Sequence, residues 1–278
     1  MSKPPFGKPF LRKTTHPKAT GRKPTLRLWA VLAWLLIWQG LSLYIGHEIL
    51  LPSPLAVIVR LIELAKEPVF WSAVWFSLLR IASGFALAVT VGVLLAAFAA
   101  RWRRIEEFLT PVMLLIKATP VASFIILVLI WVNSANLSVI ISFLMVLPIM
   151  YTNVRDGIAN TDIKLIEMAQ VFSLPKLRRV SHIYLPQTLP YFQSACMVGL
   201  GLCWKSGIAA EVIGIPTGSI GERLYLAKIY LAIPDLFAWT LTIVLVSIVF
   251  ERLFMLFLRT IVIKLERGGE RGSKPIEE

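Results

Sequence analysis

Residues 81–100 read IASGFALAVTVGVLLAAFAA, a run of twenty residues without a charged side chain. A helix of about 20 apolar residues is long enough to cross the hydrocarbon core of a bilayer. A second uncharged run covers residues 118–154 and is too long for one span. Of the 278 residues, 57% are hydrophobic and only 16% are charged, and the charges lie in clusters. This composition predicts an all-α integral membrane protein rather than a soluble domain.

The positions of the basic residues predict the orientation of the chain. A net charge of +13 favours nucleic-acid binding in a soluble protein, but here the distribution of the charge indicates a membrane and no nucleic-acid partner. Of 29 Lys and Arg residues, eight lie in 1–27, three in 101–104, five in 155–186 and five in 259–274, and the connections between these regions hold few. Cytoplasmic connections carry the excess of Lys and Arg. The alternation therefore predicts about six transmembrane helices with both termini in the cytoplasm.

The predicted organisation is a transmembrane domain at 27–263 between two cytoplasmic tails, 1–26 and 264–278. The first tail carries five prolines and many basic residues, so we expect it to be disordered. A signal peptide is the alternative, but a long apolar stretch without a nearby small-residue cleavage site favours a retained first span. An amphipathic helix is expected on the outer surface within 46–70, and a tight outer turn at 133–136. The predicted spans cover 28–45, 72–100, 117–132, 137–154, 190–212 and 236–260.

A polar, basic segment at 155–187 interrupts the apolar pattern and predicts two short helices joined by a bend. Thr161 or Asp162 can cap the first helix. Pro175 fits only an early position of the second helix, which Ser173 could cap. The segment is too apolar for a purely solvated loop, and its flanks are basic, so it could dock in a groove of a soluble partner. The alternative is an ordinary cytoplasmic loop that lies on the membrane surface.

The spacing of this segment resembles the cytoplasmic EAA loop of permease subunits in binding-protein-dependent ABC importers. Glu167-Met-Ala169 is followed by Ser173, by Ile183-Tyr-Leu-Pro186 and by Leu189-Pro190. Met168 replaces the middle Ala of the family pattern, and Ser173 replaces a Gly that permits a left-handed turn. Ser can adopt that conformation at a cost of about 1 kcal/mol. The resemblance implies that the loop contacts the ATPase through Glu167, Ala169, Ser173, Leu174, Ile183, Leu185 and Pro186.

The resemblance extends over most of residues 50–260 and is nearest to the nitrate, sulfonate, taurine and pyrimidine-precursor branch. Its motifs are Leu51-Pro-Ser-Pro54, Ser77-x-x-Arg80 with Gly84-Phe85, Thr119-Pro120 leading to Ile130-Trp131, Trp204 with Ala210-Glu211, and Gly218-x-x-Gly221. It implies a type I importer permease fold in the bacterial plasma (inner) membrane, crossed several times. The implied partners are a cytoplasmic ABC ATPase dimer, an extracytoplasmic solute-binding protein and a second permease copy, as a homodimer.

Three charges within the predicted spans are candidates for the substrate path or for structural ion pairs: Arg80, Lys205 and Glu211. A charge placed inside a membrane is a functional candidate by default. Lys205 and Glu211 are six residues apart and so do not share a helix turn. Cys196 and Cys203 are expected to be buried packing residues.

The expected function is therefore that of a permease and not of an enzyme. The sequence lacks a Gly-x4-Gly-Lys-Ser/Thr phosphate loop and metal-ligand spacing, so we expect ATP hydrolysis in a partner and neither a metal nor another cofactor in this chain. An ion-gradient-driven secondary transporter is the alternative, but we find neither inverted repeats nor paired broken helices. A membrane-embedded enzyme is a third possibility, but it would need a convergent catalytic set near one membrane face, and none is apparent in the sequence.

Overall fold

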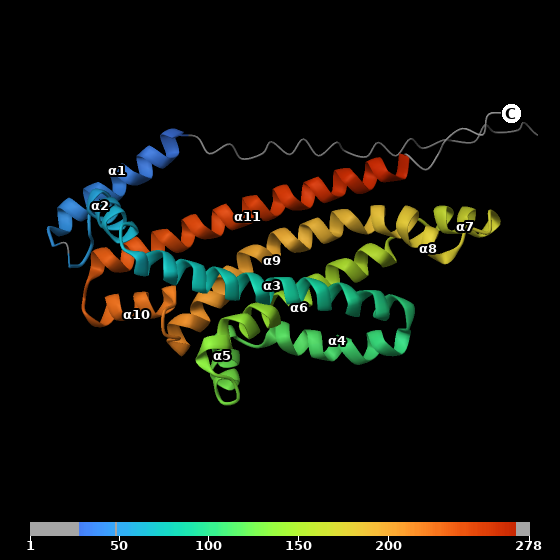
Figure 1. Ribbon diagram of the computed structural model, residues 1–278, viewed down its shortest axis with the longest axis horizontal. Coiled ribbons are helices and arrows are strands. Elements are labelled where there is room, and N and C mark those ends of the chain that lie inside the picture. Colours follow the sequence, from blue (N-terminus) through green and yellow to red (C-terminus); the bar gives the residue numbers. More distant parts are fainter. Residues whose placement is uncertain (1–27, 48, 271–278) are drawn as a thin grey trace, which may run out of the picture.

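The computed structural model describes residues 28–47 and 49–270, which form only helices and connecting turns (Figure 1). Five helices are long and apolar enough to cross a membrane, or six if one sharply bent pair counts as a single span. The prediction of an all-α membrane protein with about six spans is therefore confirmed. The helices are α1 Leu28–Ile45, α2 Pro54–Ala65, α3 Pro68–Arg101, α4 Arg103–Ala118, α5 Val121–Leu129, α6 Ser134–Ala159, α7 Ile163–Val171, α8 Lys176–Arg179, α9 Leu185–Gly214, α10 Ile220–Ile229 and α11 Ile233–Glu270.

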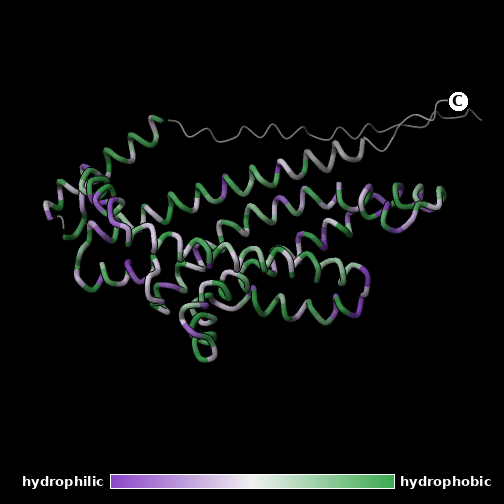
Figure 2. Tube along the Cα trace, in the orientation of Figure 1, coloured by the Kyte–Doolittle hydropathy of each residue, from purple (hydrophilic) through white to green (hydrophobic). Residues whose placement is uncertain are grey.

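The two predicted tails lie partly or wholly beyond the described residues. Residues 1–26 and 271–278 are outside them, and α11 continues as a helix to Glu270, past the boundary predicted at 263. The long helices are apolar along most of their length, and polar residues gather where α4 begins (Figure 2). At that end, Glu106 of α4 forms an ion pair of 3.3 Å with Arg155 of α6.

The centre of the bundle is α6, which packs along α3 and along α9. Small residues allow these helices to approach closely, as is common between membrane helices. A Cβ at Gly92 of α3 would lie 2.6 Å from Met150 Cβ of α6, and a Cβ at Gly207 of α9 would lie 2.7 Å from Ser142 Oγ. The three helices therefore form one closely packed unit.

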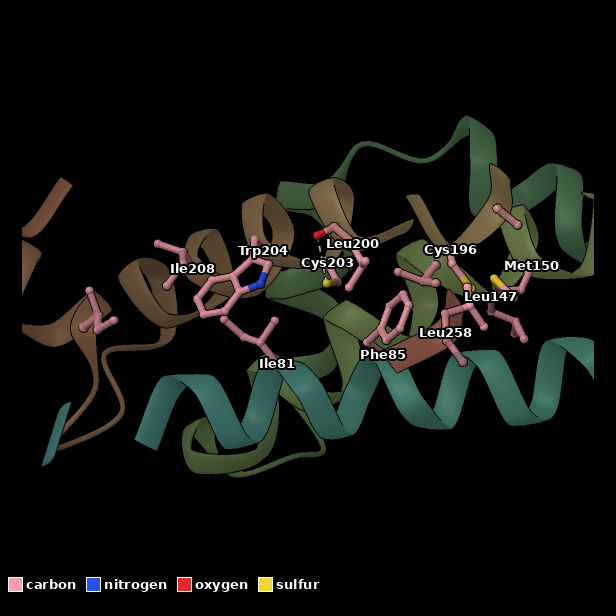
Figure 3. Packing of buried hydrophobic residues seen from close by; sticks show 14 of the residues in the cluster. Ile81, Phe85, Leu147, Met150, Cys196, Leu200, Cys203, Trp204, Ile208 and Leu258 are labelled. Atoms are coloured by element: carbon pink, nitrogen blue, oxygen red, sulfur yellow. Dashed lines mark hydrogen bonds between the residues drawn. The ribbon is translucent and has the colours of Figure 1, made fainter. Parts of the chain in front are cut away.

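Side chains from α3, α6, α9 and α11 fill the space between these helices (Figure 3). Phe85 packs edge-on against Phe254 of α11, with ring centroids 5.1 Å apart. Cys196 and Cys203 are buried and free, which confirms the expectation that they are packing residues. The centre of the chain is thus occupied by packed side chains.

The third predicted span, 117–132, is wrong as a single helix. The chain instead forms α4 and α5, which meet at an angle of 103°. Pro120 cannot donate a backbone hydrogen bond and disfavours the helical conformation at the residue before it, and Thr119 is accordingly extended, at φ −80° and ψ 130°. Lys117 lies in the last turn of α4, not at the start of a span. The predicted outer turn at 133–136 is also shorter: Asn133 caps α6, which begins at Ser134.

The amphipathic segment between the first two spans forms α2, as expected. Ser53 caps it by accepting a hydrogen bond of 3.2 Å from the amide of Ala56. Arg60 of α2 pairs with Asp235 at the start of α11 and with Glu63. These hydrogen bonds, first that of Asp235, raise the pKa of Arg60 above its ordinary value. This ion pair holds α2 against α11 at the end of the molecule opposite α7 and α8 (Figure 1).

Candidate functional site

The segment 162–184, which we call the knob, lies at one end of the bundle (Figure 1). Asp162 caps α7, because its carboxylate accepts a hydrogen bond of 2.9 Å from the amide of Lys164. At the other end of α7, the amide of Leu174 donates to Ala169 O and the amide of Ser173 donates to Gln170 O, both at 2.9 Å. This pair of bonds is a Schellman motif, which turns the chain sharply after the helix.

Ser173 takes the left-handed conformation that this turn needs, with φ +49°. The expected bend is thus present with Ser where the family pattern has Gly. The prediction that Ser173 caps the second helix is wrong, because Pro175 occupies the N-cap position of α8 without a side-chain hydrogen bond. Ser173 ends the first helix rather than starting the second.

The second helix of the knob is not a separate element. From Lys176 to Gly214 the chain is one helical run that includes a π-helical turn at Val180–Tyr184. Pro186 has no N–H for the carbonyl four residues earlier, so a wider turn at this point agrees with its chemistry. Pro186 is the sequence signal for this wider turn, in addition to its place in the loop motif.

The two chain segments that connect the knob to α6 and α9 are held together. The side chain of Gln187 accepts a hydrogen bond of 2.8 Å from the amide of Asp162. A Cβ at Gly157 near the end of α6 would lie 2.9 Å from Thr188 Cγ2 of α9. Ala169 and Ile183 are buried within the knob. The knob is therefore attached firmly to the ends of α6 and α9.

The outer surface of the knob is apolar and basic. Val171, Phe172 and Leu177 are 80%, 73% and 85% exposed, respectively. Val171 and Phe172 lie outside the candidate spans, and Leu177 is the second residue of the helical run Lys176–Gly214. Lys176 and Arg178 are exposed beside them. Large apolar side chains gathered on an exposed surface mark an interaction site.

The remaining loop residues differ in exposure. Glu167 is exposed, and its carboxylate has no hydrogen bond or ion pair with any residue that the structure describes. Leu174 is half-buried, whereas Leu185 and Pro186 are exposed at the start of α9. Of the seven predicted loop residues, Glu167 and Ser173 are thus exposed on the knob, Ala169, Leu174 and Ile183 are buried or half-buried, and Leu185 and Pro186 belong to α9.

Replacing Ser173 by Gly should stabilise the knob by about 1 kcal/mol, because Gly adopts positive φ without the steric cost of a Cβ. Amide exchange at Leu174, whose N–H is bonded to Ala169 O, should slow about fivefold. The matched control is Ser181→Gly, which removes a side chain from a position inside the helical run and should not slow exchange. Unchanged exchange at Leu174 in Ser173→Gly would contradict the proposed strain.

Arg80 and Glu211 make contacts within the bundle. Arg80 of α3 donates from Nε to the carbonyl of Ala135 at the start of α6, and its guanidinium lies 3.7 Å from the centre of the Phe76 ring. Glu211 of α9 is fully buried and accepts hydrogen bonds from Ser77 Oγ at 2.7 Å and from the amide of Gly221 at 3.3 Å. It thereby joins α3, α9 and the first turn of α10.

Lys205 is placed differently, because it is exposed and lines a groove of about 340 Å³ between α9 and α11. Glu251 of α11 lines the same groove. Sequence reasoning missed Glu251, although it is the first acidic residue after Asp235 in a strongly apolar stretch. The structure thus separates the three predicted charges: Arg80 and Glu211 make internal hydrogen bonds, and Lys205 faces an open groove. Within residues 28–47 and 49–270, no cluster of three or more His, Cys, Asp or Glu could hold a metal ion.

Comparisons with known proteins agree with this arrangement of long helices and a knob. The family described as binding-protein-dependent transport system inner membrane component matches residues 88–266. The putative aliphatic sulfonates transport permease protein SsuC of Bacillus subtilis is 26% identical over 214 residues, which cover 73% of this chain and 77% of that protein. The formylaminopyrimidine transport permease protein ThiX of Halalkalibacterium halodurans is 25% identical over 67% of this chain and 75% of its own. The nitrate import permease protein NrtB of Synechocystis is 24% identical over 86% and 89%.

Proposed function

We propose that the knob is the surface on which the cytoplasmic ATPase docks. The premise is that this chain belongs to the family of binding-protein-dependent transport system inner membrane components. The chain is the permease subunit of an ABC importer in the inner membrane, and a gradient-driven secondary transporter finds no support in the comparisons. Importers of this kind need a solute-binding protein outside and an ATPase inside. The observation that carries the docking proposal is the exposed apolar and basic surface of the knob.

The electrostatics of the knob support an ATPase rather than a lipid surface as its partner. Lys176 and Arg178 would suit anionic lipid as well as a protein, but Glu167 is exposed on the same segment and would be repelled by anionic lipid. A groove on a soluble protein can satisfy the apolar side chains and this carboxylate together. We therefore place the ATPase, and not the membrane surface, against the knob.

The solute path is proposed to lie between two permease copies. The centre of this chain, where α3, α6 and α9 meet, is filled by packed side chains. A cavity of about 430 Å³ does lie between α3, α6, α9 and α11, but its lining is apolar and does not suit a small polar solute. A second copy of the chain, in a homodimer, would supply the other wall of a path. In this arrangement Lys205 lines the path, and Arg80 and Glu211 act as structural charges that fix the starts of α6 and α10.

The solute is proposed to be small and polar. The relatives are named for aliphatic sulfonates, formylaminopyrimidine and nitrate. A solute of that class, such as taurine or a pyrimidine precursor, would be delivered by the binding protein at the end of the molecule that carries α2 and α10. The ATPases would then drive the change of access through the knobs.

Labelling of single cysteines tests this orientation and the docking surface together. An impermeant maleimide should react with Glu63→Cys in intact cells and with Leu177→Cys only in inverted membrane vesicles. Both positions are exposed, whereas the native Cys196 and Cys203 are buried and should contribute little background. Bound ATPase should then shield Leu177→Cys but not Glu63→Cys. Reaction of Leu177→Cys in intact cells, or equal reaction with and without ATPase, would overturn the proposed role of the knob.

A further inference from the structure

The groove between α9 and α11 has the size of a small-molecule site. Its volume of about 340 Å³ lies near the lower end of the range for ligand pockets. The two helices run side by side in opposite directions (Figure 1). α9 contributes Gly201, Trp204 and Lys205, and α11 contributes Ser247 and Glu251. Gly201 leaves the groove open at its position, because nothing lies within 4 Å of where its Cβ would be.

The groove holds one charge of each sign within segments that can span the membrane. Lys205 lies nine residues before the end of α9, about 14 Å along the helix. Glu251 lies eighteen residues after the start of α11, about 27 Å along it. Neither side chain forms an ion pair within 4.0 Å with any residue that the structure describes. If Lys205 and Glu251 served only as a structural ion pair, their side chains would contact each other directly across the groove.

Unpaired charges in a membrane face protein or a water-filled space rather than lipid tails. The groove between α9 and α11, which we call the Lys205 groove, therefore faces the solute path or a partner that covers it. A simple anion would gain the attraction of Lys205 but would meet the repulsion of Glu251. A simple cation would face the opposite conflict. A solute with an anionic group and an ammonium group can satisfy both side chains, and the Trp204 ring offers an apolar wall for the short chain between them.

We propose that the Lys205 groove binds the transported solute, and that this solute is a small zwitterion, such as an aminosulfonate or an aminocarboxylate. Lys205 contacts its anionic group, and Glu251 contacts its ammonium group. The claim that the bound solute is also the transported one rests on the proposed permease function. Binding in the groove itself can be measured without ATPase or transport. The proposal narrows the solute class to one that carries both charges.

The test is protection of a cysteine placed in the groove. Gly201→Cys in the full-length permease, reconstituted in nanodiscs, should react with a small methanethiosulfonate reagent. Taurine and β-alanine should slow this reaction by about tenfold at concentrations near ten times their Kd, because occupancy reduces the free site by 1 + [L]/Kd. Ethanesulfonate, nitrate and ethylammonium at the same concentrations should have little effect. Thr240→Cys, exposed on α11 but outside the groove lining, is the control for direct effects on the reagent.

The charges are then removed one at a time in the Gly201→Cys background. Lys205→Met and Glu251→Gln should each abolish protection by the zwitterions while the unprotected reaction rate stays similar, which shows that the groove is intact. The proposal is overturned if Gly201→Cys does not react, if zwitterions give no protection, if simple anions protect equally, or if protection survives Glu251→Gln. If bound ATPase failed to shield Leu177→Cys in the labelling experiment, the docking role of the knob would be overturned. The protection of Gly201→Cys by zwitterions would still stand.

Discussion

Replacing Glu167 by lysine should reduce the ATPase that copurifies with the permease by about tenfold to a hundredfold. Charge-assisted hydrogen bonds of a carboxylate contribute about 1.5–3 kcal/mol, and about 1.4 kcal/mol is a factor of ten in binding. Glu167 is exposed and has no partner among the described residues, so the substitution removes no internal contact of the permease. The permease should therefore reach the membrane at normal abundance, while substrate-stimulated ATP hydrolysis falls with docking.

The measurement is the ratio of ATPase to permease after affinity purification, beside solute uptake in the same cells. Glu67→Lys is the matched control, because Glu67 is exposed and forms no side-chain hydrogen bond or ion pair with any described residue, and it precedes α3 at the end of the molecule opposite the knob (Figure 1). Its ratio of ATPase to permease should stay at the wild-type level. If Glu167 were only a solvated residue near the start of α7, a few tenths of a kcal/mol would be at stake and the variant would bind the ATPase normally. Normal copurification of Glu167→Lys would contradict the docking role.

Replacing Gly84 by leucine should clearly lower the yield of folded protein. A Cβ at Gly84 of α3 would clash with the backbone carbonyl of Val139 and would lie 2.9 Å from Ser142 Cβ of α6. Backbone atoms cannot rotate away, so the two helices must separate. Overpacking costs typically about 1–3 kcal/mol, and the backbone contact places Gly84→Leu at the upper end of that range, where about 3 kcal/mol is a factor of about one hundred in the folding equilibrium.

The folded yield is measured as the monodisperse peak in size-exclusion chromatography of the detergent-solubilised protein. Gly201→Leu is the matched control, because it adds the same side chain inside a membrane helix where a Cβ meets no atom within 4 Å. Its yield should remain near that of the unmodified chain. Equal yields of the two variants would show that the α3–α6 contact does not require a small residue at position 84.

The sequence was most informative where one physical signal dominates. Uncharged runs placed α3 and α6 within a few residues, and Asp162 marked the start of α7. Hydropathy could not predict the break between α4 and α5, because residues on both sides of Thr119 and Pro120 are apolar and a window average does not register a backbone bend. Proline chemistry held that information.

The presence of Lys205 and Glu251 in one groove could not be predicted from spacing along the chain. The two residues are 46 positions apart, and the antiparallel packing of α9 and α11 brings them to the same groove. Glu211 and Arg80 stand out in the sequence as charges within predicted spans, but only the helix contacts show that each bonds to a neighbouring helix within the bundle. The chemical type of a residue was readable from the sequence, and its environment was not.

The firm attachment of the knob makes the packed unit of α3, α6 and α9 a lever. The knob is fastened where α6 ends and where α9 begins, through the Asp162–Gln187 hydrogen bond and the close approach of Gly157 to Thr188. A tilt of about ten degrees at that end would move the far end of α6, about 39 Å away, by about 7 Å. The knob can thus stay rigid while a small rotation imposed on it is amplified into a displacement large enough to admit or exclude a solute at the opposite face.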